Sequence, residues 1–321
     1  MSQQEELKPI TLMGATASGK TEAALGLARL LGGEIISADS RQVYKRLTAG
    51  TAKPDGAWRE EGGRRVYLVE GVPYHLVDFL DPRASYDAAS FAADAQRLAG
   101  EIKSRGRVPI IAGGTGMYVQ ALWSGLDPLP PADQAVRDEL AAFAEKEGRP
   151  ALHARLEALD PEAASKIPVN NIQRVIRALE VIRISGRPIS ELWTGRFHNA
   201  LPTHLSRFIV LSWSKKDLFE RVRARTLASF VRWEAETRAL LDEGYPEDCP
   251  ALKSLGYPQM IDYIRGDAGQ AAAAERILRV TMAYAKRQAT WFARYRNVPR
   301  VDVSSPADLL PENLLKAAGA A

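Results

Sequence analysis

The chain has 321 residues, of which 46% are hydrophobic and 26% are charged, and its formal net charge is +4. This length allows one large core with a smaller second unit, and no stretch reaches the about 20 apolar residues that span a membrane. The single cysteine, Cys249, excludes an internal disulfide, and the scattered histidines lack the spacing of a zinc site. Residues 1–8 are polar and acidic, unlike a secretion signal, so we expect a cytoplasmic protein.

Short apolar runs alternate with helical stretches over the first 125 residues. This alternation is typical of an α/β fold, in which crossover helices connect the strands of a parallel sheet. The pattern predicts strands at residues 10–13, 34–37, 75–78 and 108–112, and helices at residues 21–31 and 85–105.

The pattern changes to helices alone from residue 128 to about residue 198, with prolines and glycines at the helix boundaries. An apolar strand at 207–213 then returns the chain to the sheet. It is followed by helices at 216–243 and 271–295 and a short strand at 301–303. We therefore predict a core made of residues 1–125 and 199–321, which carries an all-helical insertion at residues 126–198.

The segment between the first strand and the first helix matches the phosphate-binding pattern G-x-x-x-x-G-K-[ST]. It consists of Gly14, Ala15, Thr16, Ala17, Ser18, Gly19, Lys20 and Thr21. Its backbone N–H groups and the helix N-terminus attract an anion, Lys20 adds a positive charge, and the Thr21 hydroxyl can hold Mg²⁺. The alternative is a glycine turn that arose by chance before a helix.

The strand at 108–112 ends in Gly113-Gly114-Thr115-Gly116, where many phosphate-cleaving enzymes carry a carboxylate for the metal. A different carboxylate, Asp39, follows the second strand. Because neighbouring parallel strands end at one crevice, Asp39 and Thr115 should face the phosphate loop, and Asp39 is a candidate general base. A cap of the turn after the strand is the alternative role of Asp39, and Asp78 keeps an ordinary nucleotide hydrolase possible.

The chain resembles the tRNA dimethylallyltransferase family over nearly its whole length. The resemblance rests on residues 14–21, 36–44, 50–54, 113–118, 173–180 and 285–291. It implies a nucleotide-kinase-like P-loop core with a helical insertion that contacts the anticodon region. It also implies transfer of a dimethylallyl group from dimethylallyl diphosphate to the N6 amine of the adenine 3′ of the anticodon, with release of diphosphate.

The resemblance also implies roles for single residues. The P-loop would hold the diphosphate with Mg²⁺ at Thr21, and an arginine of residues 218–225, with Arg225 favoured, would close over it. Asp39 would accept the proton of the amine or a hydrogen bond from it, Thr115 would lie near the reacting atoms, and Gln42 would read an adenine edge.

A tRNA surface is implied on both units. Residues 271–300 carry seven basic residues against one acidic residue, with aromatic residues between them. Gln173, Arg174 and Arg177 lie at helical spacing in the insertion. The predicted tRNA contacts are Asp39, Ser40, Arg41, Gln42, Arg137, Gln173, Arg174, Arg177, Lys286, Arg287 and Trp291. An ordinary solvated helix face is the alternative for such basic runs.

Three other functions share part of this pattern. A P-loop small-molecule kinase explains the phosphate loop and Mg²⁺ but not Gly113-Gly114-Thr115-Gly116. A prenyltransferase of free adenine nucleotides explains the catalytic residues but not the insertion, and a non-enzymatic RNA-binding protein has no use for Lys20 and Asp39 together. We expect a monomer, since no apolar helix face is left unexplained.

Overall fold

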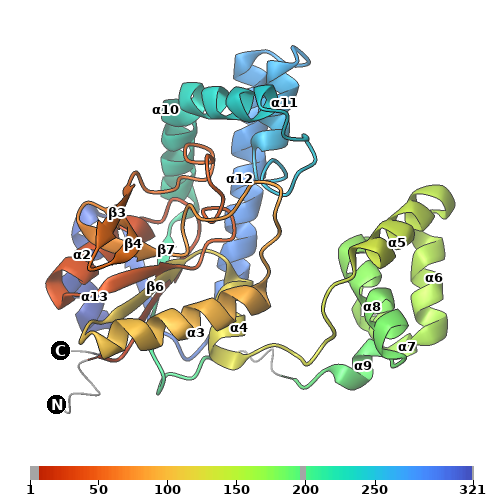
Figure 1. Ribbon diagram of the computed structural model, residues 1–321, viewed down its shortest axis with the longest axis horizontal. Coiled ribbons are helices and arrows are strands. Elements are labelled where there is room, and N and C mark those ends of the chain that lie inside the picture. The colour runs from red at the N-terminus through yellow and green to blue at the C-terminus, as the bar shows by residue number, and fades with distance from the viewer. Residues whose placement is uncertain (1–6, 196–199, 320–321) are drawn as a thin grey trace. The chain divides into compact units, whose positions relative to one another are not determined.

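A computed structural model of the protein describes residues 7–195 and 200–319. The chain divides into two compact units, one formed by residues 1–123 and 199–321 and the other by residues 124–198. Figure 1 shows their helices and strands. None of the helices in the described ranges is long and apolar enough to cross a membrane.

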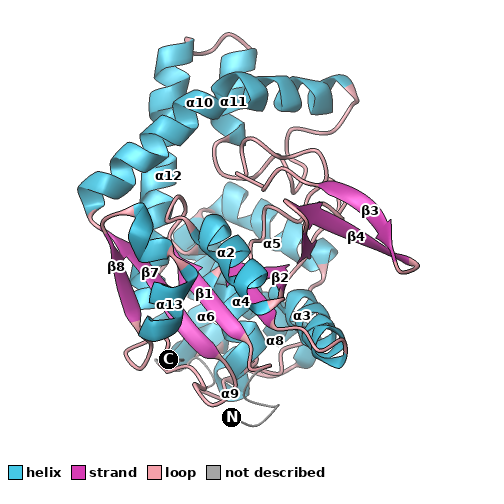
Figure 2. Ribbon diagram, turned by 90° about the vertical axis from the view of Figure 1, so that its left-hand side faces the viewer, coloured by secondary structure: helices cyan, strands magenta, loops and turns pink. Residues whose placement is uncertain are grey.

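The first unit is built on one sheet of eight strands in the order β3-β4-β5-β2-β6-β1-β7-β8 (Figure 2). The strands are β1 Ile10–Gly14, β2 Glu34–Ser37, β3 Ala57–Glu61, β4 Arg64–Val69, β5 Val72–His75, β6 Pro109–Gly113, β7 Arg207–Trp213 and β8 Arg300–Val303. The central strand β1 is parallel to both neighbours, and Leu12 lies opposite Ala112 on one side and Ile209 on the other. The carboxyl ends of β1, β2 and β6 therefore meet at one edge of the sheet.

The sequence prediction was wrong at one end of this sheet. The strand predicted at 75–78 lies at Val72–His75 instead, since Leu76 and Asp78 have positive φ angles of 56° and 53° that end the extended conformation. The antiparallel pair β3 and β4 was not predicted. Most of β3 is exposed, so it lacks the apolar run by which a buried strand is found in a sequence.

Helices cover the sheet and extend beyond it. They are α2 Lys20–Leu31, α3 Ala88–Ser104, α4 Gly116–Ser124, α10 Lys215–Asp242, α11 Tyr257–Ile264, α12 Gln270–Ala293 and α13 Pro311–Ala317, with a 3-10 turn at Pro306–Leu309. Helix α3 begins three residues later than predicted, where the Asp87 side chain accepts the N–H of Ser90. The long helices α10 and α12 lie side by side in both views and rise from the edge where the strands end (Figures 1 and 2).

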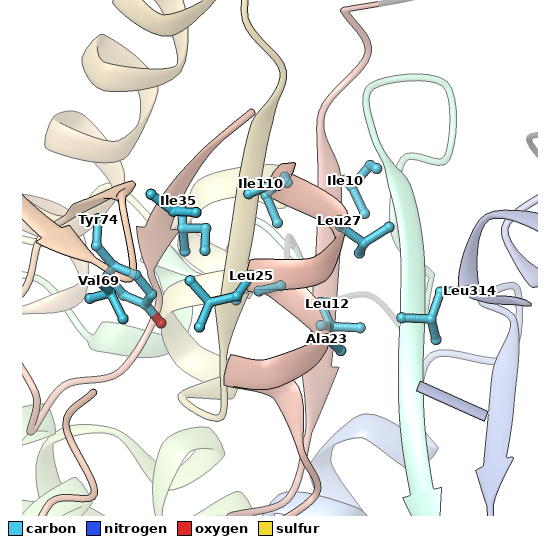
Figure 3. Close-up of a cluster of buried hydrophobic side chains, with 14 of the residues drawn as sticks. Ile10, Leu12, Ala23, Leu25, Leu27, Ile35, Val69, Tyr74, Ile110 and Leu314 are labelled. Carbon is cyan, nitrogen blue, oxygen red and sulfur yellow. The ribbon is translucent and has the colours of Figure 1, made fainter. Parts of the chain in front are cut away.

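Helix α2 is fixed to the sheet by its apolar face. Leu25 and Leu27 point toward strand residues that include Ile10, Ile35 and Ile110 (Figure 3). Full burial of such a side chain contributes about 1.5–3 kcal/mol. This packing holds the first turn of α2, and with it the phosphate loop, at the end of β1.

The second unit contains only helices. They are α5 Gln134–Glu147, α6 Arg149–Leu159, α7 Pro161–Lys166, α8 Ile172–Ser185 and α9 Ile189–Leu192. They enclose an apolar cluster of their own, with Leu152, Leu156 and Val175 fully buried. Asp133 and Asp160 begin α5 and α7 by accepting backbone N–H groups. This unit therefore has its own core and helix caps.

Candidate active site

The phosphate loop connects β1 to α2, with Ala17 and Gly19 at positive φ angles of 63° and 86°. Gly14 is required by close packing, because a Cβ there would lie 2.7 Å from Ser18 Oγ and 2.9 Å from Leu211 O. Lys20 Nζ donates to Ala15 O at 2.6 Å across the loop. Burial lowers the pKa of Lys20 to about 8, against the opposing effect of Asp39, and the neighbouring Arg225 lowers it further. An ammonium group beside a loop that leads into a helix N-terminus attracts an anion.

Asp39 follows β2, and Thr115 follows β6. Asp39 Oδ1 accepts the N–H groups of Arg41 at 2.9 Å and Gln42 at 3.4 Å, so this oxygen caps the turn. Thr115 Oγ1 accepts the N–H of Ser40 at 3.0 Å, and the Thr115 N–H donates to Ala38 O at 3.1 Å. The loops after β2 and β6 are thus joined, and all hydrogen bonds of the Asp39 carboxylate to described residues use one oxygen.

Two arginines on α10, one helical turn apart, reach the phosphate loop. Arg221 Nε donates to Ala17 O at 2.8 Å, and Arg225 Nη2 donates to Thr16 Oγ1 at 2.9 Å. Burial lowers the pKa of Arg225, while Asp39 acts in the opposite direction. The guanidinium groups therefore keep N–H donors beyond those that the loop uses, and such donors suit a phosphate group.

Gln288 on α12 is a site residue that the sequence interpretation missed. Its Oε1 accepts the N–H of Thr16 at 2.8 Å, and its Nε2 donates to Gly114 O at 2.9 Å. Both groups of one buried amide thus join the phosphate loop to the end of β6. Gln288 lies in the segment 285–291, on which the family resemblance partly rests. In this segment, Lys286, Arg287 and Trp291 were selected instead because of their charge or aromatic ring.

A cavity of about 510 Å³ within the first unit is lined by most of these groups, but Thr115 is not among its lining residues. The phosphate loop, Arg221 and Arg225 line one part of it, Asp39 and Tyr284 line another, and residues 49–52 form a further wall. Burial raises the pKa of Tyr284 to about 12, with Asp39 adding to the effect, so this phenol stays protonated. The volume is in the ordinary range for a small-molecule site. The arrangement suits a ligand with a phosphorylated end and a reacting atom near a carboxylate.

Some predicted tRNA residues form hydrogen bonds or ion pairs within the protein. The Gln42 side-chain amide donates to Ala52 O at 3.1 Å and accepts from Ser37 Oγ at 3.3 Å, so part of its hydrogen-bonding capacity is used within the protein. In the second unit, Arg137 Nε donates to Glu180 Oε1 at 2.9 Å and Arg177 Nη1 donates to Glu180 Oε2 at 2.5 Å. Burial opposes the ionisation of Glu180, but the two arginines hold its pKa below the ordinary value.

The other predicted tRNA residues lie at the surface or are half-buried. Gln173 and Arg174 are exposed on α8, and Lys286 and Arg287 are exposed on α12. Trp291 is half-buried, and its Nε1 donates to Tyr295 OH at 3.2 Å. Of the predicted contacts, Asp39, Arg41 and Gln42 line the cavity.

The residues described contain no cluster of three or more acidic, histidine or cysteine side chains that could hold a metal ion. Thr21 lines the cavity at the start of α2. A Mg²⁺ ion commonly takes only one or two protein ligands together with phosphate oxygens and water. A single hydroxyl beside an anion site fits that mode of binding.

Fold and site together define an α/β P-loop protein whose cavity combines the phosphate loop with a carboxylate. The family model described as IPP transferase matches residues 42–295, and the one described as isopentenyl transferase matches residues 8–74. The chain belongs to the IPP transferase family. This confirms the resemblance found in the sequence.

The relatives match along most of their length. A tRNA dimethylallyltransferase of Elusimicrobium minutum is 47% identical over 296 residues, which cover 92% of this chain and 94% of the relative. One from Halorhodospira halophila is 43% identical, with 88% of each chain covered. The crystal structure of a tRNA isopentenylpyrophosphate transferase from Bacillus halodurans has 34% identity and a TM-score of 0.63, with 98% of each chain covered. A eukaryotic dimethylallyltransferase that acts on tRNA, 24% identical, shares the fold with a TM-score of 0.71.

Proposed function

We propose that this protein transfers a dimethylallyl group from dimethylallyl diphosphate to tRNA, at the N6 amine of the adenine 3′ of the anticodon. The observation that carries the proposal is the Asp39 carboxylate in the same cavity as the phosphate loop. The relatives are tRNA dimethylallyltransferases by name, which supports the choice of group and acceptor. We expect the protein to act as a monomer.

The diphosphate of the donor binds at the phosphate loop. Backbone N–H groups, Lys20, Arg221 and Arg225 surround that place with positive charge. When bound there, Mg²⁺ would be held by the Thr21 hydroxyl and would add charge that stabilises the leaving diphosphate. The same groups favour the transition state, since negative charge grows on the diphosphate as its bond to the prenyl carbon breaks.

Asp39 receives the proton of the amine. The lone pair of an exocyclic adenine amine is delocalised, so the amine is a weak nucleophile and gains from a base within hydrogen-bond reach. One carboxylate oxygen is fixed by the turn after β2, and the other is left for the substrate. As the nitrogen–carbon bond forms, the carbon–oxygen bond to diphosphate breaks and the proton passes to Asp39.

The target adenine must leave its stack to reach a base inside a cavity. We assign the remaining tRNA contacts to basic, polar and aromatic groups that are exposed or half-buried. In the first unit these are the half-buried Arg41 at the cavity with Ser40 beside it, and the exposed Lys286 and Arg287 with the half-buried Trp291 on α12. In the insertion they are Gln173 and Arg174 on α8, and Arg137 and Arg177, which bind Glu180, would serve by holding α5 and α8 together beside them. Salt-dependent binding is the expected signature of such contacts.

Prenyl transfer tests the proposal directly. Radiolabelled dimethylallyl diphosphate is incubated with Mg²⁺ and either total tRNA or AMP, and label in each acceptor is counted. We expect label in tRNA only. Label in AMP would assign the protein to the nucleotide-modifying branch, and no label in either acceptor would favour a kinase.

An Asp39→Asn variant separates the base from the turn cap. Asparagine keeps the oxygen that accepts the two N–H groups but cannot take a proton, so transfer should fall by about 10²–10⁴. Asp81→Asn is the matched control, because Asp81 Oδ1 also accepts an N–H two residues ahead, from Arg83 at 2.8 Å, at an exposed turn. Equal activity of Asp39→Asn and wild type would show that Asp39 is only a cap.

A further inference from the structure

Glu236 on α10 binds a loop of the cavity wall through its carboxylate. Its Oε2 accepts the N–H groups of Thr48 and Ala49, and its Oε1 accepts that of Gly50, each at 2.8 Å. The Tyr257 hydroxyl donates to Oε1 at 2.6 Å. Among the described residues no lysine or arginine forms an ion pair with Glu236. Three successive backbone N–H groups therefore wrap one carboxylate, as loop nests wrap anions.

Side-chain packing around Gly50 also fixes the same loop. A Cβ at this position would lie 2.3 Å from Trp233 Nε1 and 2.6 Å from Tyr257 Cζ, so only glycine fits between the two rings. Trp233 lies one turn before Glu236 on α10 and is 4% exposed. Helix α10 thus fixes the position of the loop by packing as well as by hydrogen bonds.

The loop is connected in turn to the proposed base. Gln42 Nε2 donates to Ala52 O at 3.1 Å, and the Gln42 N–H donates to Asp39 Oδ1 at 3.4 Å. A displacement of residues 48–52 would therefore reach Asp39 through the backbone and side chain of a single buried glutamine.

Helix α10 also carries the arginine at the other part of the cavity. Arg225 contacts Thr16 of the phosphate loop, and Glu236 lies eleven residues further along the same helix, about 16 Å at 1.5 Å per residue. One rigid helix therefore connects the diphosphate end of the cavity with the loop that supports Asp39.

We propose that Glu236 is a positioning residue for prenyl transfer. By binding residues 48–50, it holds the cavity wall and, through Gln42, the Asp39 carboxylate at a fixed place relative to the diphosphate. This inference rests on the proposed function. It assigns Glu236 no contact with the substrate and no proton transfer.

The test is the isosteric variant Glu236→Gln, which replaces one accepting oxygen by an NH₂ group that cannot accept from the loop. We expect kcat for tRNA prenylation to fall by about tenfold to 100-fold, since misplacement of a reacting group by about 1 Å has this effect. The Kd of dimethylallyl diphosphate should stay within about twofold, because the phosphate loop is not altered. Glu234→Gln is the control, as Glu234 lies on the same helix and pairs outward with Arg238 at 2.9 Å.

A double-variant cycle with Gln42→Ala distinguishes positioning from a merely structural role. If Glu236 acts through Gln42, the losses of kcat in Glu236→Gln and Gln42→Ala should not multiply in the double variant. Multiplicative losses, or a lowered Tm with wild-type kcat, would overturn the inference.

Two further outcomes are distinguishable. If Glu236→Gln does not fold, Tyr257→Phe removes one of its hydrogen bonds, and the same cycle with Gln42→Ala is read on that variant. A wild-type protein that binds dimethylallyl diphosphate but prenylates no tRNA would contradict the proposed function itself. Wild-type transfer with an unaffected Glu236→Gln would contradict only the positioning role.

Discussion

Two pairs of arginines in this protein differ in what their guanidinium groups bind. Arg221 and Arg225 in the core donate to the phosphate loop and form no ion pair among the described residues. Arg137 and Arg177 in the insertion both bind Glu180, whose side chain is fully buried. The first pair keeps donors for a ligand, whereas the second pair neutralises a charge of its own unit.

The difference teaches that the partner of an arginine, rather than its spacing along a helix, decides its role. Arg221 and Arg225 lie four residues apart on α10, and Arg174 and Arg177 lie three apart on α8, so both sequences predict a one-sided basic face. Glu180 lies three residues after Arg177 on the same helix, and the fold adds Arg137 of α5 to this carboxylate. Arg225 has no carboxylate partner among the described residues. A buried carboxylate without its cations is strongly unfavourable, so both arginines are needed to neutralise Glu180.

The largest expected effect is on the core pair. Arg225→Gln should lower single-turnover transfer from dimethylallyl diphosphate to tRNA by about 10²–10³, as for other groups that stabilise charge in a transition state. The Tm of this variant should change little, because it loses only a hydrogen bond to the neutral hydroxyl group of Thr16. Arg223→Gln is the control, since Arg223 is exposed on the same helix and pairs only loosely with Glu220 at 3.9 Å. Wild-type transfer by Arg225→Gln would erase the contrast between the two pairs.

Substitution in the insertion pair, Arg137 and Arg177, should instead lower the free energy of unfolding. Arg177→Gln leaves a buried oxygen of Glu180 partly unsatisfied, at an expected cost of about 1–3 kcal/mol in denaturant unfolding. Arg183→Gln on the same helix breaks an exposed pair with Glu139 and should cost at most about 1 kcal/mol. A loss of tRNA affinity without a loss of stability in Arg177→Gln would show that Arg177 serves the ligand after all.

The lowered pKa of Lys20 makes both the stability of the fold and the affinity for diphosphate depend on pH. This pKa is about 8 in the folded protein against an ordinary value of 10.5, so the unfolded chain holds the extra proton between these values. This lysine therefore makes the folded state more stable as the pH rises from 8 to 10.5. The affinity for the diphosphate should move the opposite way, because the charged ammonium binds it.

The measurement is the Kd of dimethylallyl diphosphate between pH 7 and 9.5. Above the pKa of about 8 the Kd should rise by up to about tenfold per pH unit, as expected for loss of one required proton. Lys20→Met should bind weakly at every pH and show no such slope. The same slope in both proteins would assign the titration to another group.

Much of the fold could be predicted because its parts have local signals. The phosphate loop, the buried strands β1, β2, β6 and β7 and the long helices each show an apolar period or a fixed motif. Strand β3 has neither, since most of its residues are exposed and polar. Strand β4 does carry the apolar run of residues 66–69, which the sequence prediction missed, and it pairs with both β3 and β5.

Site residues that follow a strand were easier to predict than those that helices supply, among which Arg225 on α10 was named only because of the resemblance. Asp39 and Thr115 were predicted to lie close together because the ends of parallel strands meet at one edge, and Thr115 Oγ1 accepts the N–H of Ser40, the residue after Asp39. Gln288, Tyr284 and Glu236 come from helices that are adjacent only in the folded chain. The resemblance implies that Gln42 reads an adenine edge, and its neighbours in sequence do not show that its amide also bonds to Ser37 and Ala52.

The smallest predicted effect concerns Gln288, the helix residue that the sequence did not single out. Gln288→Met keeps the volume but removes both hydrogen bonds, so that Thr16 N and Gly114 O lose their partner. Leaving such groups unsatisfied should cost about 1–3 kcal/mol in unfolding, while transfer falls only about fivefold, because Lys20 and both arginines remain. Gln270→Met at the exposed start of α12 is the control. If Gln288→Met instead lost as much transfer activity as Arg225→Gln, the order of the P-loop backbone would matter as much as the positive charge around the P-loop. Backbone N–H groups would then belong, with Arg221 and Arg225, to the groups that are kept for the ligand.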